Sequence, residues 1–478
     1  MENLGKIGIF RVSGVRIFTF SVALWLTGCS SFENAVLKNE QQTQRIGEML
    51  KNTVPDPLFP LENEAVTAFD HDLDLYELLD LAFARNPETK IAWRQATIAS
   101  AKKTKADSAF YPHVTANLNA ARAEQLGAPS ADGKHLTTSL SNIIYPQVEV
   151  SCSLFKFGAH KESSQAALSA LKAANFQFNQ ALQDVAYRVE LAYFALDSAI
   201  AIVNANEQNL EDAKVALDVA QNRHQSGLAN KQDLLKAQAA YSAATFDLEN
   251  SHSAVESARA RLAVALGIQV NDNLRIATSN VQAIPDLDEL EHLIEKSLEM
   301  RQDMRAKHEE LAAKKHNLDA KKYDQYPELV AGVKASRKKI QDTPGMYNNF
   351  EAYVGLRWDI FDGHLKMAER LMAHEELEIA RHQLRAKTLT VAGEVWECFY
   401  ALKSAIQKLD SAQNSEQCAR EASNYAQEAY GNGLCSFTDL LTSQNALSVA
   451  RKQFVCAKND LSVSWVRLAY CTGKILEQ

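Results

Sequence analysis

The chain has 478 residues, of which 23% are charged and 46% hydrophobic, and its formal net charge is −8. This length suffices for two or three ordinary domains, and the low content of Gly (18) and Pro (10) argues against a disordered or low-complexity protein. The acidic balance argues against a nucleic-acid partner, because such a surface needs clustered Lys and Arg and the basic runs here are as short as Arg337-Lys338-Lys339.

The N-terminus carries the pattern of an export signal. Basic residues precede an apolar run over 17–26 that is too short to span a bilayer. The run ends in Leu-Thr-Gly-Cys, which resembles a bacterial lipobox, so we expect residues 1–28 to be a lipoprotein signal peptide and Cys29 to carry a diacylglyceryl or acyl lipid. Ser30, where an Asp would retain the protein at the inner membrane, favours delivery to the outer membrane. The alternative is an ordinary signal or an anchor helix. Residues 29–71 contain several prolines and read as an extended segment.

A helix followed by a β-hairpin is predicted next. A helical pattern begins at Asp72 and continues to about Phe110, where Tyr111-Pro112 ends it because Pro lacks an amide donor. Two stretches of alternating apolar and polar residues then predict a β-hairpin over 112–156, whose strands are joined by a Gly/Ser/Pro-rich loop over about 124–142.

The pattern then changes to heptads. Apolar residues recur at three- and four-residue steps from Leu168 to Ala220, which indicates a long, coiled-coil-like helix over 158–226. Gly227 interrupts the stripe, and a return helix over 230–267 follows.

The second half of the chain repeats this order. Leu75 and Leu290 are 215 residues apart, and Gly227 and Gly433 are 206 apart. The sequence therefore predicts a tandem duplication, with repeat 1 over 72–285 and repeat 2 over 286–478. The second repeat would comprise a helix, a β-hairpin over 327–361, a long helix over 363–431 and a return helix over 436–475.

The predicted dimensions require several copies of the chain. At ~1.5 Å per residue, each long helix would extend roughly 100 Å, which no compact domain of this size holds. The strands alternate apolar and polar residues in the manner of a membrane β-barrel, but four strands cannot close one. Three chains would supply twelve strands. The expected fold is thus an α+β membrane protein with a long coiled-coil-like α-helical barrel, a trimeric 12-stranded β-barrel and an internal tandem repeat. The alternative is a small soluble sheet.

Aromatic residues gather where the predicted strands meet the helices. An interfacial aromatic girdle would lie at this level of a membrane barrel. Its members would be Tyr111, Phe155, Phe157, Tyr326, Trp358 and Phe361.

Together these features resemble the TolC-type outer-membrane efflux protein family, in its lipoprotein branch. The resemblance covers nearly all of 72–475 and rests on the Tyr-Pro pairs, the aromatic-Gly helix starts and the Gly-Leu…Asp-Leu-Leu…Gln turns. It implies a homotrimer in the bacterial outer membrane that extends into the periplasm and forms the exit duct of a tripartite efflux or secretion system. Passage would be passive, with a periplasmic adaptor and an inner-membrane transporter as partners. The resemblance leaves open whether the cargo is a drug, a metal or a polypeptide. No pair among the other six cysteines has zinc-type spacing, and no convergent nucleophile and base are found, so we expect no metal, no enzyme activity and no cofactor beyond the lipid on Cys29.

The resemblance also implies roles for the turns between the long and return helices. The positions that would meet the adaptor's own hairpin tips are Gly227, Leu228, Gly433 and Leu434. Asp233 and Asp439 would form the periplasmic constriction, where a ring of carboxylates attracts cations. Cys435 stands where some members have a turn Arg, which implies a weaker lock. The alternatives are residues that only make turns, and Asp residues that only cap helices.

Two further readings concern Cys398 with Cys471, and the possibility of an enzyme. The two cysteines fall level on the last helical hairpin, so they form either a disulfide or two small buried hydrophobes. The pairs His308/His316 and His374/His382 each lie eight residues apart, roughly 80° away from a shared helix face, which is not metalloprotease spacing.

A lipid-anchored, periplasm-spanning coiled-coil scaffold without a pore remains the alternative to a duct.

Overall fold

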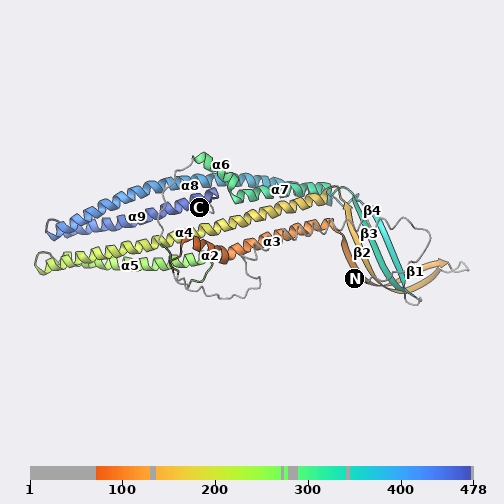
Figure 1. The fold of residues 1–478 in the computed structure, drawn as a ribbon, viewed down its shortest axis with the longest axis horizontal. Coiled ribbons are helices and arrows are strands. Elements are labelled where there is room, and N and C mark those ends of the chain that lie inside the picture. The colour runs from red at the N-terminus through yellow and green to blue at the C-terminus, as the bar shows by residue number, and fades with distance from the viewer. Residues whose placement is uncertain (1–70, 130–135, 271–273, 278–288, 341–344, 475–478) are drawn as a thin grey trace, which may run out of the picture. The chain divides into compact units, whose positions relative to one another are not determined.

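The computed structural model describes residues 71–129, 136–270, 274–277, 289–340 and 345–474, all within one compact unit that runs from Val66 to Gln478. The predicted signal peptide and Cys29 lie outside the described residues. Within this unit the strands gather at one end and two helix–turn–helix hairpins end at the other (Figure 1). The helices are α2 (Leu75–Arg85), α3 (Pro87–Asp107), η1 (Ser108–Phe110), α4 (Ala159–Gln225), α5 (Lys231–Leu266), α6 (Leu290–Met300), α7 (Gln302–Tyr323), α8 (Leu365–Gly431) and α9 (Phe437–Thr472). The strands are β1 (His113–Pro129), β2 (Leu136–Phe155), β3 (Glu328–Ile340) and β4 (Tyr347–Arg357).

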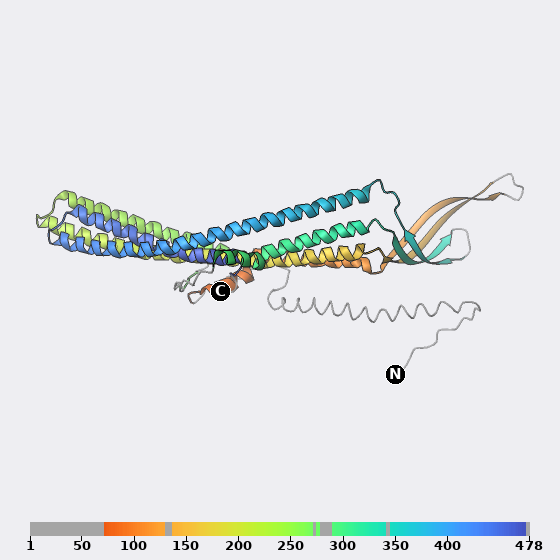
Figure 2. The same cartoon turned by 90° about the horizontal axis from the view of Figure 1, so that it is seen from above.

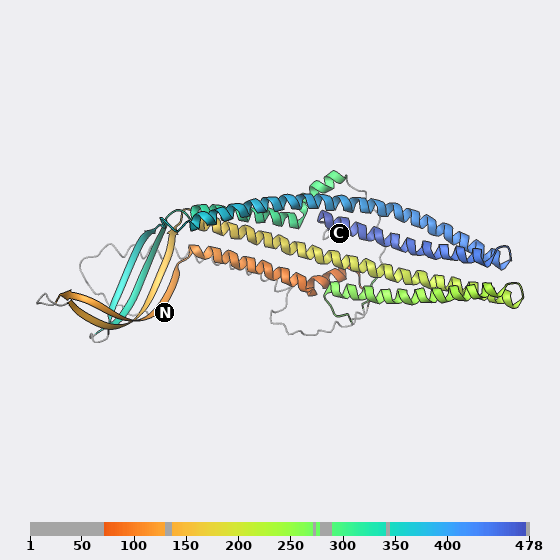
Figure 3. The same ribbon diagram turned by 180° about the vertical axis from the view of Figure 1, so that it is seen from behind.

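The helices form one extended layer. α3, α4, α7 and α8 lie side by side in that order, with α5 packed on α4 and α9 packed on both α8 and α4 (Figure 3). α4 and α8 have 67 residues each, so each extends roughly 100 Å. The apolar stripe of α4 packs against α2 and α5 through residues such as Val185, Val189 and Leu196. The stripe of α8 packs against α6 and α9 through Val391, Val395 and Leu402.

The helix expected from Asp72 to Phe110 is interrupted, contrary to prediction. Asn86 ends α2 and caps α3, because its side-chain oxygen accepts from the Glu88 amide (2.8 Å) and Pro87 occupies the first helical position. The Asn86 amide group also donates to the carbonyl of Ala265 (2.8 Å). Gly267 follows α5 with a φ of 74°, and a Cβ there would lie 2.8 Å from the Asn86 Cα. The end of the return helix α5 therefore packs against this interruption.

The second half has the same arrangement, and the sequence did not reveal it. Arg301 separates α6 from α7 at the position 215 residues after Asn86. Gly473, 206 residues after Gly267, ends α9 with a φ of 78° and lies against Arg301, since a Cβ there would lie 3.4 Å from the Arg301 Cα.

The four strands form one antiparallel sheet in the order β1-β2-β3-β4. The register aligns Val114 with Val150, Val150 with Val333, and Val333 with Ala352, so the apolar positions of all four strands share one face. The opposite face carries Thr115, Asn117, Glu149, Lys334, Glu351 and Tyr353. Among the strands that the structure describes, β1 and β4 each pair on one side only, so the sheet has two open edges.

The strands of the first hairpin are longer than predicted, and the loop between them is shorter. A loop was expected over about 124–142, but the antiparallel pairing continues through Leu126 and Thr138, and β1 ends only at Pro129 (Figure 2). The pairing shifts between Leu126 and Pro129, which is where a residue without an amide donor is tolerated. Backbone pairing thus overrides the local turn composition until this irregularity.

Candidate functional site at the helical hairpin tips

The two turns between the long and return helices have the same geometry. Gly227 and Gly433 adopt φ values of 72° and 76°, in the left-handed region that Gly occupies without steric cost. In each turn the next residue donates its amide back to the long helix, Leu228 to Arg223 O (2.8 Å) and Leu434 to Ala429 O (2.7 Å). The Leu side chains are 69% and 79% exposed. Each tip therefore presents one apolar side chain to solvent.

The carboxylates predicted for a constriction lie in the first turns of the return helices. The Asp439 carboxylate accepts from the Ser436 hydroxyl (2.6 Å) and amide (3.1 Å), which closes a capping box on α9. These hydrogen bonds lower the pKa of Asp439 below its ordinary value and keep it anionic. Asp233 donates its backbone amide to Asn230, which caps α5. Asp439 thus performs the capping role that was the alternative reading, and its place in a constriction stays a prediction.

An arginine that sequence analysis overlooked joins the two tips. Arg223, near the end of α4, donates to the carbonyls of Tyr430 (3.0 Å) and Gly431 (2.9 Å) at the end of α8. Its guanidinium also lies 5.1 Å from the centre of the buried Tyr430 ring, which contacts Phe437 edge-on. We call this contact between Arg223 and Tyr430 the tip clasp.

The tip clasp provides an arginine near the turn where Cys435 replaces the Arg of some family members. The Cys435 thiol lies 3.4 Å from the carbonyl of Ala426, within its own hairpin. A cation at this turn is instead supplied by Arg223, from the other hairpin. The one available signal was an asymmetry between the repeats, since Arg223-His224 corresponds to Ala429-Tyr430 at the 206-residue offset.

Behind the clasp, the two hairpins are joined along α4 and α9. Small residues allow close approach, and a cluster of Ala216, Ala220, Ala237, Ala426, Tyr430, Phe437 and Leu440 is buried between them. Arg451 of α9 donates to Asp212 (2.7 Å) and Asn209 (2.7 Å) of α4. Lys452 pairs with Asp247 of α5 (2.8 Å). The tips of one chain therefore form a single packed unit.

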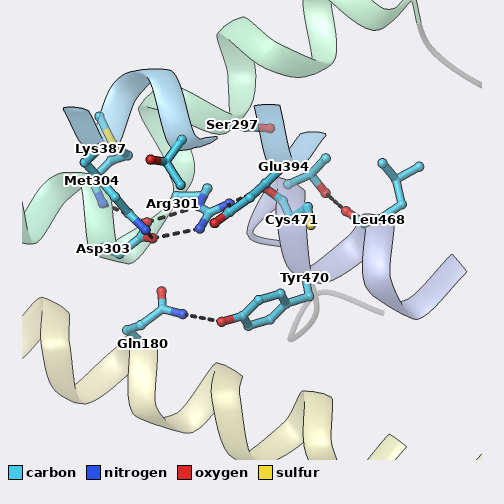
Figure 4. Close-up of polar contacts among 12 residues, drawn as sticks. Gln180, Ser297, Arg301, Asp303, Met304, Lys387, Glu394, Leu468, Tyr470 and Cys471 are labelled. Carbon is cyan, nitrogen blue, oxygen red and sulfur yellow. Dashed lines mark hydrogen bonds and ion pairs between the residues drawn. The ribbon is translucent and has the colours of Figure 1, made fainter. Parts of the chain in front are cut away.

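A buried ionic cluster holds the other end of the α8–α9 hairpin (Figure 4). Arg301, 4% exposed, donates to Glu394 of α8 (2.6 Å), to the Cys471 carbonyl of α9 (3.2 Å) and to Asp303 (2.7 Å). Lys387 of α8 also pairs with Asp303 (2.7 Å). Burial acts to raise the pKa of Asp303, but the hydrogen bonds from Arg301 and Lys387 outweigh it and hold that pKa low. A hinge between α6 and α7 is thereby locked to both helices of the hairpin.

Cys398 and Cys471 lie in the same buried cluster between α8 and α9. Both are free thiols in this structure. The hydrogen bond with Cys398, and then burial, raise the pKa of the Cys471 thiol above its ordinary value. Their juxtaposition agrees with the level inferred from the sequence, and a disulfide between them stays a prediction.

The sheet and its junction with the helices present a second candidate surface. On the apolar face, Leu118, Phe350 and Val354 are each more than two-thirds exposed. At the junction the aromatic residues proposed as a girdle are exposed too, and Phe157 lies 4.9 Å from Phe155 and 5.4 Å from Tyr326 between ring centres. On the opposite face, Lys334 lies 3.6 Å from Glu149. One face thus suits lipid and the other suits water.

The histidine pairs have ordinary surroundings. His316 lies 2.6 Å from Glu162 of α4, in a contact between α7 and α4. Among the residues that the structure describes, no three His, Cys, Asp or Glu side chains gather as a metal site. None of the described helices is both long enough and apolar enough to cross a membrane.

A family model described as outer membrane efflux protein matches residues 78–268 and 293–474. The chain belongs to this family. It is similar to the protein CyaE of Bordetella pertussis, with 23% identity over 409 residues that cover 84% of this chain and 85% of that protein. It is also similar to nodulation protein T of Rhizobium leguminosarum, with 21% identity over 342 residues, 69% of each chain.

Solved channels share the fold. The CmeC outer membrane channel of Campylobacter jejuni superposes with a TM-score of 0.72 at 19% identity, covering 88% of this chain and 94% of that one. The open state of the MtrE outer membrane channel of Neisseria gonorrhoeae superposes with a TM-score of 0.69 at 18% identity, covering 84% of this chain and 89% of that one. Membership of the family confirms the predicted resemblance and places the protein in the outer membrane as an exit channel rather than an enzyme.

Proposed function

We propose that three copies of this chain form the outer-membrane duct of a tripartite efflux or secretion system, through which substrates pass passively. The observation that carries the proposal is the two-faced, four-stranded sheet with two open edges. Unpaired strand edges are not tolerated in lipid, and four strands do not close a barrel. Pairing β4 of one copy with β1 of the next would give twelve strands with the polar face inside.

The helical layer supports the same assembly. α3 and α8 lie at its two sides, so each has a flank that no helix of its own layer covers. Exposed apolar side chains occur on both, with Ile91 and Ile98 on α3 and Leu371, Ile379 and Leu389 on α8. Packing α8 of one copy against α3 of the next would bury them and continue the layer into a closed tube.

The partners follow from the tips and the N-terminus. Leu228 and Leu434 are apolar, exposed and held on rigid turns, which suits docking against the hairpin tips of a periplasmic adaptor that bridges to an inner-membrane transporter. Asp233 and Asp439 would surround the entrance, with Asp439 anionic. A lipid on Cys29 would anchor the mature chain to the same membrane.

Single-channel recording distinguishes the duct from a scaffold without a pore. Purified protein in planar bilayers should give discrete ohmic conductance steps, whereas a scaffold gives none. Neighbouring residues on opposite faces of β4 supply a matched pair of variants. Ala352→Arg, on the apolar face, should abolish insertion at a cost of roughly 2–4 kcal/mol per chain. Glu351→Arg, on the polar face, should insert and shift ion selectivity towards anions. Equal insertion of both variants would contradict the barrel.

A further inference from the structure

Three cations lie in the part of the sheet far from the helices, with Arg337 and Lys339 near the end of β3 and Arg122 seven residues before the end of β1. β1, β2, β3 and β4 adjoin the helices at His113, Phe155, Glu328 and Arg357, so their other ends form the far rim. Along β1 and β3, Arg122, Arg337 and Lys339 continue the same alternation as the lipid-facing Leu118, Val333 and Ala335. The register confirms this, because Lys339 aligns with Ile144 and Arg337 with Asn348. These cations therefore point outward from the barrel, not into its lumen.

Their height places them at the edge of the apolar band. Arg337 and Lys339 lie eight and ten residues beyond Leu329, the first apolar position of β3. With ~3.4 Å per residue and a tilt of about 40°, they stand roughly 21 and 26 Å above it, against about 25 Å for the apolar band of an outer-membrane barrel. Their charged groups would therefore meet the headgroup layer of the outer leaflet.

The described side chains of this face carry unbalanced positive charge. Arg122, Arg337 and Lys339 are exposed, and none forms an ion pair or hydrogen bond through its side chain with the described residues. Glu149 and Glu351 both lie on the opposite face, where Glu149 is matched by Lys334. Lys338, between the two cations of β3, also points to that face and lies 5.5 Å from the ring centre of Tyr145. Among the side chains that the structure describes, the outward face of the strands carries these cations and no carboxylate; Glu124 continues the alternation of β1 two residues beyond Arg122, and its side chain lies outside the described ones.

Given the membrane orientation of the proposed function, on which this step rests, we infer that Arg122, Arg337 and Lys339 bind the phosphates of the phosphorylated glycolipid in the outer leaflet. β1 and β3 are two strand spacings apart, about 9.6 Å, so long side chains from both reach one headgroup with two phosphates. Arg guanidinium groups bind phosphate oxygens in bidentate fashion. The site would fix the barrel's depth and attach a ring of glycolipid around the channel.

The test compares a triple variant, Arg122→Gln/Arg337→Gln/Lys339→Gln, with Lys338→Gln as the control on the opposite face. The probe is bisphosphorylated lipid A in mixed micelles, measured by its retention on the detergent-purified protein. Each cation near a phosphate surface contributes roughly a fivefold factor, so the triple variant should bind about a hundredfold more weakly. Lys338→Gln should bind as the unaltered protein does.

Two further arms identify the ligand. Lipid A stripped of both phosphates should bind the unaltered protein as weakly as the intact lipid binds the triple variant. Inorganic phosphate at millimolar concentration should leave lipid A bound. Three results would each overturn the inference. They are binding of lipid A by the triple variant as tight as by the unaltered protein, binding of the stripped lipid as tight as of intact lipid A, and full displacement of lipid A by inorganic phosphate. Conductance of the same preparations tests the duct separately, since an absent pore with intact phosphate-dependent binding refutes only the proposed function.

Discussion

A lone carboxyl group inside the helical layer predicts a pH-dependent stability. Glu190 of α4 is 5% exposed and forms no hydrogen bond or ion pair with the described residues. It lies one turn from Ala186 and Tyr187, which pack on Val466 and Tyr470 of α9, so it shares the face that α4 presents to α9. Burial raises the pKa of Glu190 from 4.5 to about 7.

The two pKa values of Glu190 set the size and sign of the effect. Between about pH 4.5 and 7 the folded protein binds this proton more tightly than the unfolded chain, so the free energy of unfolding falls as the pH rises through that window. At about 1.4 kcal/mol per pH unit, the cost of the ionised carboxylate reaches ~3 kcal/mol above pH 7. Glu190→Gln removes the charge and should stabilise the protein by about that amount at pH 8, with little effect near pH 4.5.

Thermal melts of the detergent-purified protein at pH 5 and pH 8 measure this difference. Glu190→Gln should raise the melting temperature at pH 8 and raise it only about a quarter as much at pH 5. Glu207→Gln, at an exposed position of the same helix, is the control and should behave as the unaltered protein at both pH values. If Glu190→Gln destabilises the protein at pH 8, the ionised Glu190 carboxylate must make a stabilising contact that outweighs the cost of its burial. That result would refute the reasoning.

Four other substitutions test the tips and the anchor. Arg223→Ala removes two hydrogen bonds to carbonyls, a loss of roughly 2 kcal/mol per chain, and should raise the mean conductance in planar bilayers if the tip clasp holds the entrance narrow; an unchanged conductance would show that the clasp has no such role. Leu228→Asp and Leu434→Asp should each reduce crosslinking to the adaptor in cells while trimer yield stays constant. Retained crosslinking would show that these leucines do not dock the adaptor and that the turns are only structural. Cys29→Ser should abolish incorporation of labelled palmitate, and continued labelling would exclude the predicted lipidation.

Much of the fold follows from local patterns in the sequence. The heptad stripe from Leu168 to Ala220 specifies a long helix, and strict alternation along β4 from Phe350 to Leu356 specifies which face is apolar. Both patterns depend on neighbours within one element, so they can be read without knowing the tertiary structure. The exposed Leu228 could be located in the same way, because a Gly marks the turn beside it.

The residues that were missed depend on contacts far along the chain. Arg301 ends α6 without a nearby Pro or Gly, and it is held there by Glu394 and the Cys471 carbonyl, 93 and 170 residues away. Arg223 looks like an ordinary solvated arginine until the fold brings it to Tyr430, 207 residues away. The break at Asn86 did carry a local signal, since Pro87 follows a capping residue, but the periodicity on both sides masked it.

Subunit stoichiometry tests the central claim most directly, because the open edges of β1 and β4 demand neighbouring copies. Native mass spectrometry of protein extracted in mild detergent should release an intact assembly of three chains. A single chain that remains folded and monodisperse in buffer without detergent would contradict the account, since its sheet would then need neither lipid nor partner strands.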